Sequence, residues 1–181
     1  LSKLDGMFAF AIWDNLKKKL ILARDKFGEK PLFYLNDNSN GLIFSSNVSS
    51  LILMMDDNER KISQESLYNY LNLSYLIGNK TFFNQVKQLE PSSYLVFDKN
   101  TNLKKIKIHK YWKLENLVLQ DKKNLEIKEA TSVFEELFSK SVNKRMTGDV
   151  EPGSFLSGGV DSSLITLNMS KNLNSSFISH N

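Results

Sequence analysis

The chain has 181 residues, and its 24 Lys and Arg against 20 Asp and Glu give a formal net charge of +4. Hydrophobic residues make up 41% and aromatic residues 11%, which excludes disordered, collagen-like and low-complexity chains. The absence of cysteine excludes disulfides, cysteine–zinc sites and thiol nucleophiles within these residues.

Charge and hydropathy also limit the kinds of partner that the chain can bind. The longest apolar run, residues 7–13, is far shorter than the roughly 20 residues of a membrane-spanning helix, and no secretory signal opens the chain. The short lysine runs lack the clustered arginines and interleaved aromatic residues of a nucleic-acid interface. We therefore expect a soluble globular protein with neither a nucleic-acid nor a membrane partner. We also expect it in the cytoplasm, a location that the absence of cysteine fits without requiring.

The first half predicts β-structure. Residues 7–14 and 20–25 are apolar runs on either side of a polar turn and predict a hairpin. Because the early strands are nearly apolar on both faces, we expect cover on both sides of their sheet. One helix is predicted at residues 63–73, with Ser63 as its N-cap. Further strands are predicted at residues 32–35, 42–46, 93–98 and 106–112, the last two around a turn at 99–102.

The second half predicts a different organisation. The polar residues 113–124 predict an interdomain linker, and residues 125–146 carry apolar side chains at the spacing of a long helix. A strand at 154–156, a glycine turn, a helix from about Asp161 and a strand starting at 177–178 form the opening of a parallel α/β unit. Because one strand and one helix cannot bury both faces of a sheet, we expect the chain to be part of a longer protein.

Residues 157–162, Ser-Gly-Gly-Val-Asp-Ser, carry the clearest chemical signal. Adjacent glycines permit positive φ, and the start of the following helix offers free amides and the positive end of its dipole. This combination suits a phosphate. Ser157 and Ser162 add hydroxyls, and Asp161 could hold Mg²⁺. The alternative is a tight turn in which Asp161 only caps the helix; the full hexapeptide favours phosphate binding.

The segment LSGGVDSSLI resembles the pyrophosphate loop of the ATP-pyrophosphatase superfamily and, within it, glutamine-hydrolysing asparagine synthetases. LDGMFAFAIWD, LARDKFGEKPLFY and EPSSYLVFD are similar to the distal part of the class II glutaminase domain of that family. Two residues depart from the family pattern: Ser92 stands where glycine is usual after Pro91, and Glu151 stands where proline is usual.

The resemblance implies an α/β protein: an α+β glutaminase sandwich of the Ntn type, followed by the start of a parallel-sheet synthetase domain. Its expected limits are 1–112 for the C-terminal part of the glutamine amidotransferase domain, 113–124 for the linker, and 125–181 for the N-terminal part of the synthetase domain. The implied nucleotide-binding residues are Leu156, Ser157, Gly158, Gly159, Asp161 and Ser162, with Asp161 as the metal ligand.

The resemblance also implies a reaction. Glutamine is hydrolysed in the first domain, ammonia travels inside the protein, and ATP adenylates aspartate to a β-aspartyl-AMP that ammonia converts to asparagine. The substrates are then aspartate, glutamine and ATP, with ATP and Mg²⁺ as cofactors. No catalytic residue is expected in this chain, because the nucleophilic cysteine of the family would precede Leu1, so the chain alone should be inactive. A homodimer is compatible with this picture.

Several alternatives stay open. The enzyme could be a related amidotransferase or a β-lactam synthetase-like ligase acting on another carboxylate, or the chain could be a non-catalytic nucleotide-binding module. Arg24, Asp25 and Lys30 either lie at the domain interface or support the glutaminase, or they form an ion pair at the end of the hairpin that contributes little if it is exposed. The ion pair is favoured. Met7 either lies along an ammonia route or packs in the core, and the core is favoured.

Overall fold

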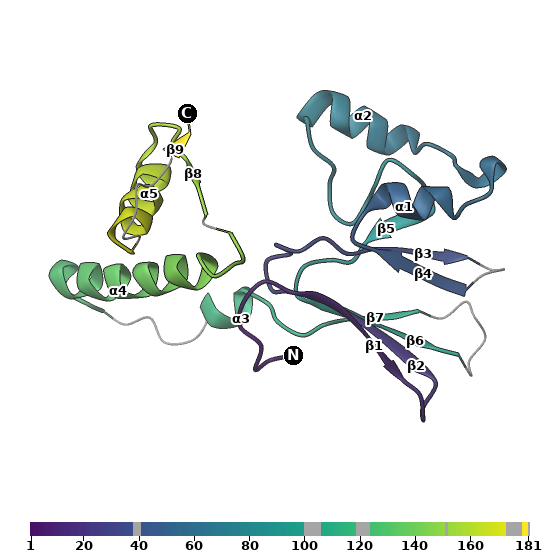
Figure 1. Cartoon of the computed structure of the whole chain (residues 1–181), viewed down its shortest axis with the longest axis horizontal. Helices are drawn as coiled ribbons and strands as arrows, with labels where there is room; N and C mark the ends of the chain where they lie inside the picture. The colour runs from purple at the N-terminus through teal and green to yellow at the C-terminus, as the bar shows by residue number, and fades with distance from the viewer. Residues whose placement is uncertain (38–40, 100–105, 119–123, 151, 173–178, 181) are drawn as a thin grey trace. The chain divides into compact units, whose positions relative to one another are not determined.

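The computed structural model describes residues 1–37, 41–99, 106–118, 124–150, 152–172 and 179–180 (Figure 1). The chain divides into two compact units, Leu1–Leu119 and Gln120–Asn181. The first contains two antiparallel sheets with helices, so the predicted mixture of helix and strand is confirmed at this level. None of the helices within the described residues has the length and apolarity that a membrane crossing requires.

The first sheet of unit 1 has four antiparallel strands in the order β1-β2-β6-β7. The predicted hairpin and the predicted later strand pair are both confirmed within it, although residues 100–102 of the predicted turn lie outside the described residues. The strands are β1 (Ala9–Asp14), β2 (Lys19–Arg24), β6 (Ser93–Asp98) and β7 (Lys107–Lys110).

The second sheet has three antiparallel strands in the order β4-β3-β5. These are β3 (Phe33–Asp37), β4 (Gly41–Ser45) and β5 (Val86–Gln88). Strands β3 and β4 match the prediction, but β5 and the helix α1 (Val48–Leu53) were not predicted. Both are short, and α1 is set by a cap: the Asn47 side chain accepts a hydrogen bond from the Ser49 amide at 2.8 Å.

Two hydrophobic clusters pack between the layers of unit 1. One joins the two sheets and consists of Leu22, Leu32, Tyr34, Leu89 and Leu95. The other joins the second sheet to α1 and consists of Leu35, Leu51, Met55 and Val86. The second sheet is therefore covered on both faces, as predicted. For the first sheet that prediction is wrong in the described part of the chain, because Ile12 and Trp13 on β1 are 52% and 46% exposed.

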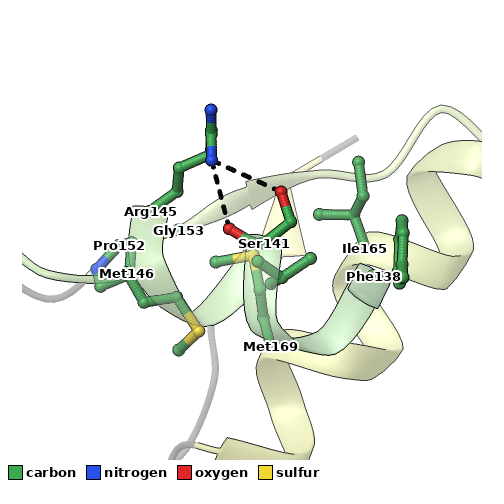
Figure 2. Close-up of a pocket in the computed structure, with 9 residues that line it drawn as sticks. Phe138, Ser141, Arg145, Met146, Pro152, Gly153, Ile165 and Met169 are labelled. Carbon is green, nitrogen blue, oxygen red and sulfur yellow. Dashed lines mark hydrogen bonds between the residues drawn. The ribbon is translucent and has the colours of Figure 1, made fainter. Parts of the chain in front are cut away.

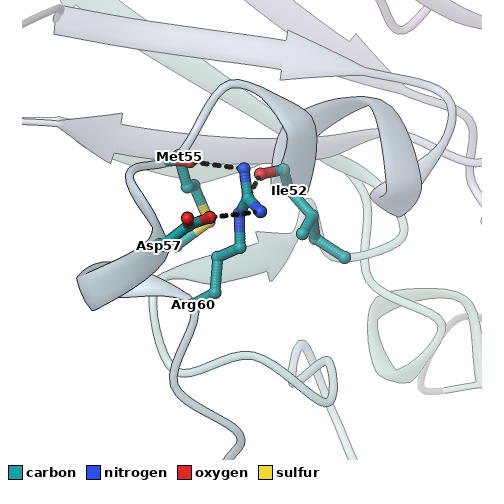
Figure 3. A network of polar contacts seen from close by, with 4 residues as sticks. All are labelled: Ile52, Met55, Asp57 and Arg60. Carbon is teal, nitrogen blue, oxygen red and sulfur yellow. Dashed lines mark hydrogen bonds and ion pairs between the residues drawn. The ribbon is translucent and has the colours of Figure 1, made fainter.

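The C-terminal end of α1 is held by one arginine (Figure 3). Arg60 Nε donates to the Ile52 carbonyl at 3.0 Å, and its Nη2 donates to the Met55 carbonyl at 2.9 Å. The remaining Nη1 lies 2.6 Å from a carboxylate oxygen of Asp57, in the 3₁₀ turn η1 (Asp57–Glu59). Arg60 thus supplies donors to carbonyl groups that a helix end leaves without intrahelical partners.

Helix α2 (Gln64–Leu73) agrees with the prediction, including its cap. The Ser63 hydroxyl accepts a hydrogen bond from the Ser66 amide at 3.2 Å, and the helix ends at Ser74, which adopts φ +62°. Within the predicted linker the structure contains a short helix, α3 (Glu115–Val118), while residues 119–123 of that linker lie outside the described residues.

Unit 2 contains α4 (Ile127–Arg145), β8 (Ser154–Phe155), α5 (Val160–Asn172) and β9 (Ser179–His180). β8 pairs with β9 in parallel, so the predicted order of strand, loop, helix and parallel strand is confirmed. The expected strand start at 177–178 lies outside the described residues. Helix α4 has the predicted periodicity, but it has no buried residue among those described, and Phe134 and Leu137 of its apolar stripe are 56% and 61% exposed.

Candidate functional site

The glycine loop lies between β8 and α5, where the sequence predicts phosphate binding (Figure 1). Gly158 adopts φ +79°, and a Cβ added there would meet no atom within 4 Å. The glycine is therefore required by the backbone conformation and not by crowding. The open space above it is available to a ligand that approaches the main chain.

Two hydroxyls close the loop. Ser157 Oγ and Ser162 Oγ lie 3.0 Å apart in a hydrogen bond that either can donate. Ser162 Oγ also lies 3.1 Å from the carbonyl oxygen of Gly159, to which it donates. The structure thus brings together residues at both ends of the predicted motif. Leu156 beside it is half-buried, and Asp161 is exposed in the first turn of α5.

The loop has the features that a phosphate group needs. The first amides of a helix lack intrahelical acceptors and stand at the positive end of its dipole, and α5 begins at Val160, directly after the two glycines. Mg²⁺ in nucleotide sites is usually held by one or two carboxylates together with the phosphates. The exposed Asp161 fits that arrangement as a single ligand. In the described residues no group of three or more His, Asp or Glu side chains could hold a metal by itself.

A separate apolar cavity of about 330 Å³ lies in unit 2 (Figure 2). Phe138 and Val142 of α4 line it together with Pro152 and with Ile165 and Met169 of α5. No residue of the glycine loop lines it. Most of the lining side chains belong to the faces of α4 and α5. No sequence motif therefore indicated this cavity.

Arg145 borders the same cavity. Its Nη1 lies 3.4 Å from both the carbonyl oxygen and the hydroxyl oxygen of Ser141, one turn earlier in α4 (Figure 2). These contacts are long for hydrogen bonds to a guanidinium. Arg145 and Ser141 are thus polar residues in a lining that is mostly apolar.

Arg24, at the end of β2, is buried, with only 5% of its surface exposed. Its guanidinium donates to three carbonyl oxygens: Nε to Lys30 at 2.7 Å, Nη1 to Leu89 at 2.7 Å and Nη2 to Gly28 at 2.5 Å. Lys30 contributes its backbone to this arrangement, and its side chain is exposed. Arg24 therefore joins the loop after β2 to the segment after β5.

Asp25 beside it is fully buried, at 0% exposure. One carboxylate oxygen accepts from the amides of Phe27 and Glu29 at 3.1 and 2.9 Å. The other oxygen accepts from the amides of Phe8 and Lys30 at 3.3 and 2.9 Å. Burial by itself would raise the pKa of Asp25, but these four hydrogen bonds outweigh it and hold the pKa below its usual value.

The favoured interpretation of these residues as a simple ion pair at the end of the hairpin is therefore wrong. Arg24 and Asp25 form a buried cluster, hereafter the Arg24–Asp25 cluster, in which each charge is satisfied by backbone groups. Gly28 closes it at φ +69°, where an added Cβ would lie 2.9 Å from atoms of both Arg24 and Pro91. Ser92, which departs from the family glycine, adopts φ +56°, a conformation that explains the usual glycine.

Met7, for which a core position was favoured, is 36% exposed and belongs to neither hydrophobic cluster. That prediction is wrong for the described residues. His109 stacks on Tyr94 with ring centroids 5.0 Å apart, an environment that gives it a packing role in the first sheet.

Comparison with protein families identifies both halves of the chain. The model of the glutamine amidotransferase domain matches residues 1–112. The chain belongs to this family. The model of asparagine synthase matches residues 133–179, which include the glycine loop. The two matches thus fall on the two halves whose motifs resemble a glutaminase and a synthetase.

Curated relatives agree with these matches. Asparagine synthetase [glutamine-hydrolyzing] 1 of Bacillus subtilis is 37% identical over 91% of this chain and 24% of its own length. Asparagine synthetase [glutamine-hydrolyzing] 2 of the same organism is 35% identical over 88% of this chain and 22% of its own length. Amidase chry2 of Gibberella zeae is 30% identical over 91% of this chain and 23% of its own length. The chain therefore spans about a quarter of the length of these relatives.

Proposed function

We propose that the complete protein is an ATP-dependent, glutamine-hydrolysing asparagine synthetase. The observation that carries this proposal is the loop of residues 157–162. Its Gly158 at φ +79° precedes α5, and the Ser157 hydroxyl pairs with that of Ser162 in the first turn of α5, in a chain whose residues 1–112 match a glutamine amidotransferase domain. A nucleotide-binding loop joined to a glutaminase is the arrangement that an enzyme needs to place ammonia from glutamine on a carboxylate activated by ATP.

The proposed assignment of the chain follows its motifs. Residues 1–112 are part of the glutaminase domain, 113–124 the linker and 125–181 part of the synthetase domain. ATP, with Mg²⁺, supplies the activation of the aspartate side chain as a β-aspartyl-AMP. Leu156, Ser157, Gly158, Gly159, Asp161 and Ser162 form the nucleotide site.

The loop residues have distinct tasks in this proposal. The first amides of α5 donate to phosphate oxygens and stabilise the charge on the departing pyrophosphate. The hydroxyls of Ser157 and Ser162, which are hydrogen-bonded within the loop, turn to donate to the phosphate when it binds. Gly158 allows the main chain to approach those oxygens, and the Asp161 carboxylate holds the metal. Because the amides are fixed by the helix before the ligand binds, they need no reorganisation during the reaction.

The change Asp161→Asn in the complete protein tests the proposal. Asparagine keeps the size and the capping ability of Asp161 but removes the charge, so ATP-dependent amide formation should fall by about 10²-fold or more, while glutamine hydrolysis survives. Asp149→Asn, an exposed aspartate outside the loop, is the matched control and should keep both activities. Glutamate, AMP and the amide product are measured in parallel.

Three results would contradict the proposal. Unchanged amide formation in Asp161→Asn would leave Asp161 as a helix cap only. Glutamine hydrolysis without any ATP-dependent product in the unsubstituted protein would favour a nucleotide-binding module without synthetase activity. Loss of both activities in Asp161→Asn with an intact fold by circular dichroism would contradict the independence of the two sites.

A second candidate differs in the acceptor. The alternative is a related amidotransferase or a β-lactam synthetase-like ligase that acts on a different carboxylate, and the relatives include one protein, amidase chry2, whose name is not that of an asparagine synthetase. Pyrophosphate release in the presence of aspartate and of a panel of other carboxylic acids distinguishes the two candidates. Release that depends on aspartate supports asparagine synthesis, and release with another acid only would overturn it.

A further inference from the structure

Tyr111 is bound to the Arg24–Asp25 cluster at the point where the first sheet ends. Strand β7 ends at Lys110, and Tyr111 follows it. The Tyr111 hydroxyl donates to the carbonyl oxygen of Arg24 at 2.9 Å, and its amide donates to the carbonyl oxygen of Ser92 at 2.9 Å. Burial, assisted by the nearby Asp25 carboxylate, raises the pKa of Tyr111, so the hydroxyl remains a donor.

The residue after Tyr111, Trp112, is held by an aromatic contact to the loop that follows Asp25. The Trp112 ring contacts the Phe27 ring edge to face, with centroids 5.5 Å apart. The Ser92 amide donates to the Asp25 carbonyl at 2.8 Å, which ties the segment that receives Tyr111 to the loop that carries Phe27. Two consecutive residues are thus fixed to one rigid loop by hydrogen bonds and an aromatic contact.

The chain then stays close to the same loop. Residues 113–116 line a groove of about 610 Å³ together with Lys26, Ser92 and Trp112. The groove includes the start of α3, which ends at Val118. The direction of the chain after the sheet is therefore set by residues 111–112 and by the Arg24–Asp25 cluster.

We infer that Tyr111 is a positioning residue that fixes where the chain leaves the glutaminase unit, and that the complete protein needs this to couple glutamine hydrolysis to amide formation. The inference rests on the proposed function. Ammonia made in one unit is used in the other only if it arrives before it escapes to water. If the residues that follow β7 came away from unit 1, they would lengthen the flexible connection between the two units, and the effective concentration that a connection provides falls as it lengthens.

The chemistry of the contact favours tyrosine specifically. A phenylalanine would fill the same volume and keep the backbone hydrogen bond to Ser92. Only the hydroxyl reaches the carbonyl of Arg24, at the buried centre of the cluster. The substitution Tyr111→Phe therefore removes one interaction and preserves the packing.

Tyr94→Phe is the matched control, because Tyr94 lies on β6 of the same sheet and stacks on His109 of β7. A hydrogen bond contributes about 0.5–1.5 kcal/mol, so opening of the Tyr111 amide should become roughly 2- to 12-fold more frequent in Tyr111→Phe. Hydrogen exchange at that amide measures the opening. In the complete protein the ratio of glutamate released to amide formed should rise in Tyr111→Phe and stay unchanged in Tyr94→Phe.

The outcomes separate this inference from the proposed function. Faster exchange at Tyr111 with a raised ratio, at an unchanged rate of glutamine hydrolysis, supports positioning. Faster exchange with an unchanged ratio would overturn it and leave a structural contact only, and unchanged exchange would overturn it as well. If the unsubstituted protein forms no amide at all, the proposed function fails, and the coupling role of Tyr111 fails with it.

Discussion

The substitution Asp25→Asn tests whether one buried carboxylate organises the loop that follows β2. In the structure its two oxygens accept four amide hydrogen bonds, two each. Asparagine offers one oxygen and one NH₂ group. In its better orientation the oxygen keeps the amides of Phe27 and Glu29, and the NH₂ group faces the amides of Phe8 and Lys30, which are donors themselves.

The expected loss of stability follows from these two amide donors, which no longer have an acceptor. Each buried donor without an acceptor costs about 1–3 kcal/mol, which gives about 2–6 kcal/mol for the pair. The contact to Phe8 is long at 3.3 Å and was therefore weak before the change. We expect a loss in the lower half of that range, about 3 kcal/mol of unfolding free energy.

Asp14→Asn provides the matched control. A single oxygen of Asp14 accepts from the amides of Leu16 and Lys17, at 3.0 and 2.9 Å, in an exposed turn. Asparagine can keep both hydrogen bonds with its own oxygen. The same chemical change should therefore alter the free energy of unfolding by no more than about 0.5 kcal/mol at this site.

Urea unfolding followed by tryptophan fluorescence measures the difference. The protein has two tryptophans, and both, Trp13 and Trp112, lie in unit 1, so the signal reports the unit that contains Asp25. A loss of about 3 kcal/mol lowers the urea midpoint by roughly 1–3 M for ordinary slopes. A midpoint for Asp25→Asn equal to that of Asp14→Asn would refute the organising role of the carboxylate.

The pH dependence of the unfolding free energy provides an independent test with the same variant. The pKa of Asp25 is lower in the folded state than in the unfolded chain, so its ionised form stabilises the fold. That contribution is fully present above the unfolded pKa of about 3.9 and is lost as the pH falls through the folded pKa. The stability gap between wild type and Asp25→Asn should therefore be constant near neutrality and narrow below about pH 4. A gap that widens on acidification would contradict this sign.

Two further substitutions test the backbone of unit 1 by the same unfolding measurement. Gly28→Ala should destabilise clearly more than Gly78→Ala. Both glycines have nearly the same φ, +69° and +68°, but only at Gly28 would the Cβ lie 2.9 Å from other atoms; equal losses would show that the clash relaxes freely. Arg60→Met should cost about 1–3 kcal/mol, because it removes donors to two carbonyls at the end of α1. Asp57→Asn, which removes only a partner whose side chain is 89% exposed, should cost well under about 1 kcal/mol, and a larger loss there would place the stabilisation in the ion pair.

The sequence by itself determined the elements with strong local signals. Alternating apolar runs around a polar turn predicted the β1–β2 hairpin, and the serine cap predicted the start of α2 at Gln64. The 3.6-residue period predicted α4, and adjacent glycines predicted the positive φ in the loop before α5. In each case residues close in sequence decide the conformation, because capping, turn chemistry and periodicity act over a few residues.

Only the tertiary structure decided which of these elements are covered and which charges are buried. The strand β5 is three residues long, and it forms because β3 supplies its hydrogen-bond partners. The early strands of both sheets are rich in apolar residues, but α1 packs against the second sheet. These outcomes depend on contacts between distant segments, which no local pattern contains.

The Arg24–Asp25 cluster shows the same division most clearly. Two adjacent charged residues at the end of a predicted hairpin suggested an ion pair between their side chains. Arg24 instead reaches the Leu89 carbonyl, 65 residues away in the chain, and receives the Tyr111 hydroxyl on its own carbonyl, 87 residues away. A charge is buried where backbone groups from distant segments converge to satisfy it, so its burial is a property of the assembled fold and could not be predicted from the local sequence.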